Sequence, residues 1–203
     1  MMKLEISEYG VYYIYDYIQE YNWDKYDFEK TEISQRLLRY KDGKEVAMDF
    51  FTNKLTEAVI EFSNNVLGSE IDEIALVAVP PSKVGKYSPI SESINTIVDS
   101  FNHRQLNKKF KYIKTIHNFS NLLKRVKDVY PSHKKGKRAI YAEHITSIEC
   151  NEELVENSHK IAILILDDIT TTGMIMTVCE DILIDYDVEE DNIYKLAIAN
   201  TIR

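Results

Sequence analysis

The stretch that decides the fold is Ile161-Ala-Ile-Leu-Ile-Leu-Asp167-Asp168-Ile-Thr-Thr171-Thr172-Gly173-Met-Ile-Met176, an apolar run that ends at two carboxylates and a hydroxyl-rich turn. The apolar residues predict a strand buried on both faces, and the turn predicts the start of a helix. Loop amides and a helix N-terminus favour an anion, and Gly173 lets the backbone come close to it. We therefore expect this loop to hold a phosphorylated sugar, with the two aspartates on a ribose diol or on magnesium-bound water. The alternative is a buried strand whose aspartates only cap a helix.

Residues 163–173 resemble the phosphoribosyl diphosphate (PRPP) loop of type I phosphoribosyltransferases. That pattern has four apolar residues, two acidic ones, two arbitrary ones, and then Thr-Thr-Gly-x-Thr or Ser. The resemblance implies that Thr170, Thr171, Thr172 and Gly173 bind the 5′-phosphate.

Two positions of the loop depart from the family pattern. Ile175 occupies the last hydroxyl position, so only its backbone amide could serve there. Thr171 stands where purine-salvage members of the family have a catalytic aspartate. This second departure argues against a hypoxanthine or guanine enzyme of the usual kind.

A second loop follows the apolar run at residues 73–79 and begins with Pro80 and Pro81. It is no nucleoside-triphosphate P-loop, because a proline replaces the first glycine and the final Ser or Thr is missing. The resemblance implies that Pro81, Ser82 and Lys83 bind the diphosphate of PRPP. A rigid proline turn without a ligand is the alternative.

Positive charge is concentrated between His103 and Arg138, where twelve basic residues and one acidic residue give a net charge of +11. The rest of the chain has a net charge of −19, which is a poor surface for general nucleic-acid binding. A compact polyanion such as a diphosphate fits this local concentration better. The resemblance implies a mobile basic loop over PRPP, with Arg125, Lys127 and Arg138 closing on the ligand. A solvated loop whose lysines only aid solubility is the alternative.

Residues 37–43, Leu-Leu-Arg-Tyr-Lys-Asp-Gly, are similar to the entry segment of the competence-type (ComF-like) phosphoribosyltransferases. The zinc-binding cysteines of many such proteins are absent here. The two cysteines, Cys150 and Cys179, have neither metal-ligand nor disulfide-framework spacing. The five histidines also lack metal-ligand or nucleophile spacing, and we expect each at the surface or in the core.

Alternating strand and helix signals predict an α/β fold with a doubly wound, mostly parallel sheet. We expect one domain over residues 1–203, with a tyrosine-rich strand or hairpin in a small hood at 1–45 and the core at 46–203. The expected helices are 47–66, 89–101, 118–125 and 174–184. The expected strands are 73–79, 110–116, 139–148, 161–166 and 192–199.

The resemblance implies transfer of the 5-phosphoribosyl group from PRPP to an unidentified acceptor, with release of diphosphate. Asp167 and Asp168 would hold the ribose, and Mg²⁺ would bind through PRPP, with at most water-mediated contact to the protein. A catalytically silent PRPP or nucleotide sensor and a nucleic-acid accessory protein are the alternatives. The sequence shows no signal peptide or membrane span, so we expect a cytoplasmic protein. A homodimer is among the assemblies that the sequence leaves open.

Overall fold

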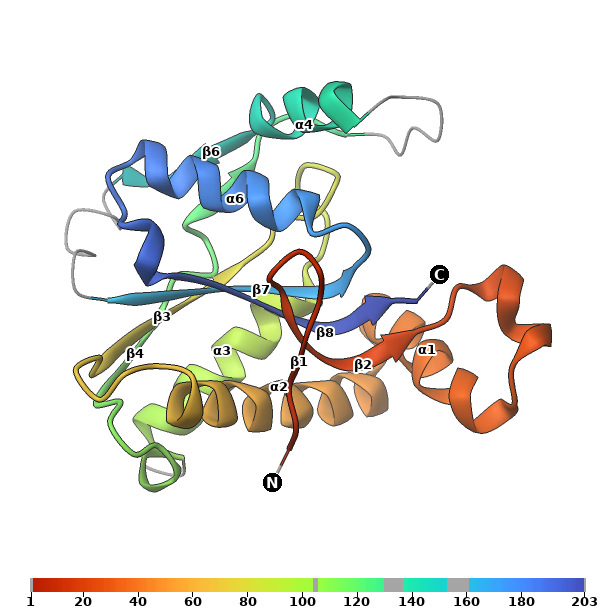
Figure 1. Ribbon diagram of the computed structural model, residues 1–203, viewed down its shortest axis with the longest axis horizontal. Coiled ribbons are helices and arrows are strands. Elements are labelled where there is room, and N and C mark those ends of the chain that lie inside the picture. Colours follow the sequence, from red (N-terminus) through yellow and green to blue (C-terminus); the bar gives the residue numbers. More distant parts are fainter. Residues whose placement is uncertain (1, 104–105, 130–136, 153–160, 203) are drawn as a thin grey trace.

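The computed structural model describes residues 2–103, 106–129, 137–152 and 161–202, and a six-stranded sheet forms its centre (Figure 1). The strands of this sheet are β1 (Glu5–Ile6), β2 (Tyr12–Tyr17), β3 (Glu73–Ala78), β4 (Thr115–Asn118), β7 (Ala162–Thr170) and β8 (Ile193–Thr201). Their spatial order is β1-β2-β8-β7-β3-β4. Every pair from β2 to β4 is parallel, and only β1 at the edge is antiparallel to its neighbour. The predicted, mostly parallel sheet is therefore confirmed.

Helices cover both faces of this sheet (Figure 1). The helices of the structure are α1 (Phe28–Lys41), α2 (Glu45–Asn65), α3 (Pro89–Asn102), α4 (Lys137–Ile145) and α6 (Met174–Asp185). Helices α1, α2 and α3 share one core cluster, whereas α6 belongs to the cluster on the opposite face. A small second sheet pairs β5 (Leu123–Arg125) with β6 (Ile148–Cys150). The described residues also form three short 3₁₀ helices, η1 (Glu20–Lys25), η2 (Asn107–Lys109) and η3 (Glu190–Asn192). The coarse architecture is α/β with helices on both faces.

The alternating faces of β3 explain why a continuous apolar run forms a central strand. Ile74 and Leu76 point into the cluster around α2 and α3, whereas Ala75 and Val77 point into the cluster around α6. All four side chains are fully buried. Burial of one such Leu or Ile side chain stabilises the fold by about 1.5–3 kcal/mol, so both faces of the strand favour apolar residues.

The connections on either side of the sheet centre run in opposite directions. From β3 the chain passes through α3 to β4, whereas from β7 it passes through α6 to β8. Such a reversal leaves a crevice at the carboxyl ends of the two central strands, where open α/β sheets bind ligands. The start of α3 is built as predicted, because Ser88 Oγ accepts a hydrogen bond from the Ser91 amide (3.2 Å) and Pro89 is the first helical residue.

Three of the predicted elements are wrong. The strand expected at 110–116 starts only at Thr115, because Thr115 pairs with Glu73, the first residue of β3, and earlier residues have no partner strand. The helix expected at 118–125 is instead a turn followed by β5, which pairs with β6. The strand expected at 139–148 is instead α4, and the chain becomes extended only at Ile148.

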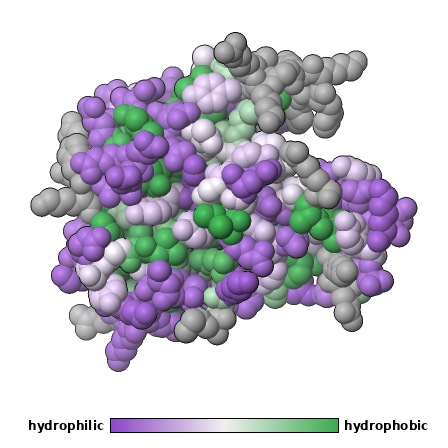
Figure 2. All heavy atoms as spheres, viewed as in Figure 1, coloured by the Kyte–Doolittle hydropathy of each residue, from purple (hydrophilic) through white to green (hydrophobic). Residues whose placement is uncertain are grey.

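The N-terminal segment extends the sheet. Strand β1 forms a hairpin with β2, and β2 pairs in parallel with β8. Hydrophilic side chains dominate the face shown in Figure 2, and apolar side chains are visible between them in small groups. Within the described ranges, no helix has both the length and the apolar character that a membrane span requires.

Candidate functional site

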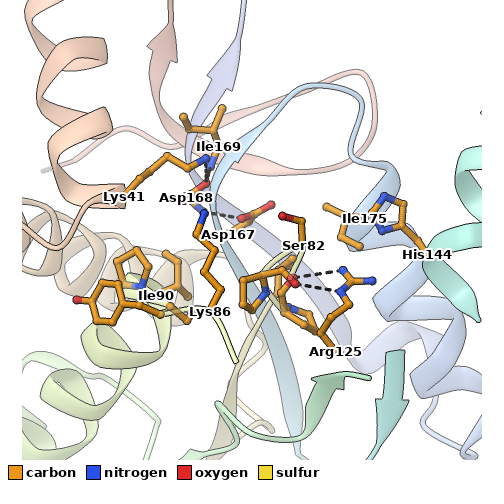
Figure 3. A pocket seen from close by; sticks show the side chains of 16 residues that line it. Lys41, Ser82, Lys86, Ile90, Arg125, His144, Asp167, Asp168, Ile169 and Ile175 are labelled. Carbon is orange, nitrogen blue, oxygen red and sulfur yellow. Dashed lines mark hydrogen bonds and ion pairs between the residues drawn. The ribbon is translucent and has the colours of Figure 1, made fainter. Parts of the chain in front are cut away.

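A cavity of about 310 Å³ opens at the carboxyl ends of β3 and β7 (Figure 3). Asp167 and Asp168 line it from β7, and Pro81 and Ser82 line it from the loop after β3. The two strands are in register there, since the Val79 amide donates to the Leu166 carbonyl oxygen (2.9 Å). The structure thus brings the acidic pair and the proline turn to one cavity.

The acidic pair is held in place by the backbone that follows it. Asp167 Oδ1 accepts from the Asp168 amide (2.8 Å), and Asp168 Oδ1 accepts from the Ile169 amide (2.7 Å). Burial, and then the neighbouring charge of Asp168, raise the pKa of Asp167 well above its ordinary value. A bound cation, or hydroxyl groups that donate hydrogen bonds, would stabilise the ionised form of Asp167.

Lys41 at the end of α1 forms an ion pair with this acidic pair. Its Nζ lies 3.1 Å from Asp168 Oδ1. Burial alone would lower the pKa of Lys41, but Asp168 and then Asp167 outweigh this and raise the pKa above its ordinary value. Lys41 was not among the predicted site residues, although it lies in the 37–43 segment that resembles the ComF-like proteins.

A chain of buried hydroxyl groups positions the end of α1. Tyr40 Oη is 2.9 Å from Ser93 Oγ on α3, which is 2.7 Å from Thr52 Oγ1 on α2. Three helices are therefore tied together one residue before Lys41. Gly43 follows with φ of +67°, and Tyr87, another cavity residue, packs so close that a Cβ on Gly43 would lie 3.0 Å from its ring.

Arg125 stabilises the proline turn through hydrogen bonds to its carbonyl groups. Its Nε donates to the Pro81 carbonyl (2.9 Å), one terminal nitrogen donates to Ser147 Oγ (2.6 Å), and the other reaches the Pro80 carbonyl (3.4 Å). The side chain is only 4% exposed and lies on β5, where Leu123 and Arg125 both point inward. Its predicted place in a covering loop is therefore wrong, because the guanidinium is a fixed wall of the cavity.

The segment after β5 is also attached to the proline turn. The Val129 amide donates to the Ser82 carbonyl (2.8 Å), and the Val84 amide donates to Asp128 Oδ1 (2.8 Å). Lys127, which directly precedes Asp128, is exposed. Residues 130–136 of the predicted covering loop lie outside the described part, as does the side chain of Arg138, whose backbone is in the first turn of α4.

A second cavity of about 280 Å³ adjoins the hydroxyl loop, and Thr170, Thr171, Thr172 and Gly173 line it as a group. Thr170 Oγ1 accepts from the Gly173 amide (3.1 Å), and Thr171 Oγ1 lies 3.0 Å from Thr201 Oγ1. Gly173 has φ of +66° and directly precedes α6. The first three amides of a helix have no acceptor within it, so this cavity offers donors to an anion.

Lys83, the cation expected at the diphosphate position, does not line the central cavity. Lys83 lines a neighbouring cavity of about 210 Å³ beside Lys124, whereas Lys86 lines both this cavity and the central one. Sequence reasoning missed Lys86 and also His144, which lines the central cavity and the hydroxyl-loop cavity. Neither residue belongs to a recognisable motif, so chain topology alone places them there.

No protein-family model matches the chain, and a search of the curated proteins gave no match. Within the described ranges, no group of three or more His, Cys, Asp or Glu side chains could hold a metal ion. The site itself is therefore the basis for a functional assignment. It combines a carboxylate pair with Lys41, Lys86 and Arg125 at the ligand-binding edge of an α/β sheet.

Proposed function

We propose that this protein binds PRPP with Mg²⁺ and transfers the 5-phosphoribosyl group to an acceptor, with release of diphosphate. The observation that supports this best is that two loops, expected to bind three parts of one ligand between them, line adjoining cavities. The acidic pair would hold the ribose hydroxyls, and the hydroxyl loop would hold the 5′-phosphate. Pro81 and Ser82, with Lys86, would hold the diphosphate.

The reaction asks this site mainly for positioning. The bond from the anomeric carbon to the diphosphate oxygen breaks, and the acceptor nucleophile forms a bond to the same carbon. Positive charge develops on the ribose ring, and Asp167 and Asp168 would stabilise it when a bound cation keeps both carboxyls ionised. Anchoring the sugar at both phosphate ends fixes the reacting carbon between them, which lowers the entropic part of the barrier.

The residues present fit a magnesium ion that arrives with the substrate. Mg²⁺ prefers oxygen ligands and keeps several waters, and the adjacent carboxylates of Asp167 and Asp168 suit such waters. When bound, the ion would neutralise charge on the departing diphosphate. The cytoplasm, where phosphorylated sugars are made and used, is the location that this proposal implies.

A PRPP sensor without catalysis is the second candidate. Ile175 favours it, because this residue lines both cavities and replaces the last hydroxyl of the loop pattern. The two candidates share the binding site and differ in turnover. Release of diphosphate from PRPP in the presence of nucleobase and amine acceptors would identify the enzyme, whereas tight binding without release would identify the sensor.

Thermal unfolding with PRPP and Mg²⁺ tests the shared binding step. A ligand at a hundredfold excess over its Kd stabilises the folded state by about 2.7 kcal/mol. The double variant Asp167→Asn/Asp168→Asn should lose this ligand-induced shift, measured against its own ligand-free Tm. The matched control, Asp185→Asn/Asp187→Asn, removes two exposed carboxylates at the C-terminal end of α6 and should keep the shift. Equal shifts in both double variants, or no shift in the wild type at millimolar PRPP, would contradict the proposal.

A further inference from the structure

His144 on α4 lies between the two cavities that the proposed ligand would occupy. Its side chain lines both the central cavity and the hydroxyl-loop cavity, and Ile175 from α6 lines the same two cavities. Figure 3 shows the imidazole ring beside the Ile175 side chain and above Arg125. The ring is therefore within the region that the sugar phosphate would occupy.

Packing from two sides fixes this position. Tyr141, one helical turn earlier, donates from Oη to Asp181 Oδ2 on α6 (2.7 Å). Ile145, the next residue, packs in the core cluster around α6. Ser147 Oγ donates to the His144 carbonyl (2.8 Å) and accepts from Arg125. The backbone of His144 is thus connected both to α6 and to the arginine that supports the proline turn.

The imidazole has hydrogen-bonding capacity that the protein leaves unused. Among the described residues, Nδ1 of His144 is buried and has no hydrogen-bond partner. Burial, and then the charge of Arg125, lower the pKa of His144, so the neutral ring has one N–H donor at neutral pH. Buried polar groups nearly always have a partner, and a turn of the ring toward the cavities that His144 lines would bring this nitrogen to a ligand oxygen.

The His144 N–H could replace a hydroxyl group that the loop pattern has at position 175 and this chain lacks. Ile175 stands in the first turn of α6, directly after Gly173 and Met174, at the position where the loop pattern has a hydroxyl group. Its side chain can give a phosphate no hydrogen bond. We propose that His144 supplies the side-chain hydrogen bond to the 5′-phosphate that Ile175 cannot, which makes it a further ligand-binding residue. This inference rests on the proposed function of the hydroxyl loop.

Calorimetric titration with ribose 5-phosphate and, separately, with inorganic diphosphate tests the inference on the full chain. His144→Leu should weaken ribose 5-phosphate binding about tenfold, as expected for one hydrogen bond to a charged group. Diphosphate binding should change less than about twofold, since that ligand occupies the proline turn. His144→Gln keeps an N–H donor and should retain most of the affinity.

The decisive variant adds the missing hydroxyl. Ile175→Thr in the His144→Leu background should recover most of the lost ribose 5-phosphate affinity, because it restores a hydroxyl donor beside the place of the lost imidazole. Unchanged ribose 5-phosphate affinity in His144→Leu, equal losses for both ligands, or no recovery by Ile175→Thr would each overturn the inference. Failure of the wild type to bind ribose 5-phosphate would refute the proposed function itself, which is a separate outcome.

Discussion

Asp167→Asn should make the ligand-free protein more stable although it damages the ligand site. The wild-type carboxyl is half-buried next to Asp168, and desolvation and then the charge of Asp168 raise its pKa. The folded state therefore holds a proton that the unfolded state releases, and this difference opposes folding at neutral pH. Asparagine removes the penalty, and its side-chain oxygen can still accept from the Asp168 amide as Asp167 does at 2.8 Å.

The sign and size of this effect follow from linkage. For a carboxyl whose pKa is raised by folding, stability falls as pH rises from the unfolded pKa of about 3.9 to the folded pKa. Each pKa unit of this rise costs about 1.4 kcal/mol. A rise of a single unit already predicts a gain of about 1.4 kcal/mol for Asp167→Asn, or about 3–6 °C in Tm for a chain of this size. Lys41 keeps its ion pair with Asp168, so it loses only part of its electrostatic support.

Urea unfolding at about pH 4 and about pH 7.5 is the measurement. The advantage of Asp167→Asn should be only about 0.4 kcal/mol at pH 4, where about half of the unfolded carboxyl is also protonated, and should reach its full size at pH 7.5. Asp49→Asn removes an exposed carboxylate of α2 and is the control for net charge. A variant that is no more stable than the wild type at pH 7.5, or a gain equal at both pH values, would refute the electrostatic reasoning.

Two further substitutions test how the walls of the site are built. Arg125→Met should destabilise the fold by about 2–4 kcal/mol, because it leaves the Pro80 and Pro81 carbonyls without their donor; Lys127→Met, in the exposed position nearby, should stay within about 0.5 kcal/mol of the wild type in the same urea titration. Gly173→Ala should lower the free energy of unfolding more than Gly85→Ala does. Both positions have φ near +67°, which costs an alanine about 1–2 kcal/mol. Only the new Cβ at position 173 contacts a neighbour, because Tyr9 Cβ would lie 3.0 Å from it. Equal losses for the two glycines would show that the contact with Tyr9 does not matter.

The parts of the fold that sequence patterns predicted are those whose signal is local. The run before Asp167 had to be a buried strand because both of its faces are apolar, and the structure places it at the sheet centre. The start of α3 was equally legible, since Ser88 and Pro89 together specify a helix cap. In both cases the responsible residues are neighbours in the chain.

The wrong predictions concern segments whose conformation depends on distant partners. Strand β5 exists because Leu123 pairs with Cys150, and no pattern in residues 118–125 announces that pairing. Helix α4 contains β-branched and aromatic residues that favour a strand, but packing on α6 through Tyr141 overrides this weak preference. Tertiary contacts decide such segments.

The same limit applies to the candidate site. Lys41 approaches Asp168 across well over a hundred positions in sequence, through a helix end held by the Tyr40 and Ser93 hydroxyls. His144 reaches the hydroxyl loop because α4 packs on α6. Sequence spacing predicted the residues within each loop, whereas the residues that complete the cavity come from elements that only the fold brings together.

The central cavity has both acidic and basic side chains, and this combination limits the kinds of ligand that it can bind. Asp167 is a carboxyl whose raised pKa would fall toward its ordinary value beside a cation, whereas the unpartnered His144 nitrogen and the nearby Lys86 favour an anion. A simple anion would be repelled by the carboxylates of the acidic pair. A free metal ion would be repelled by Lys86 and would give the His144 N–H no acceptor. A phosphorylated sugar that carries magnesium on one side and hydroxyl groups in its middle meets both demands at once, which is why we prefer it to a free phosphate or a bare cation.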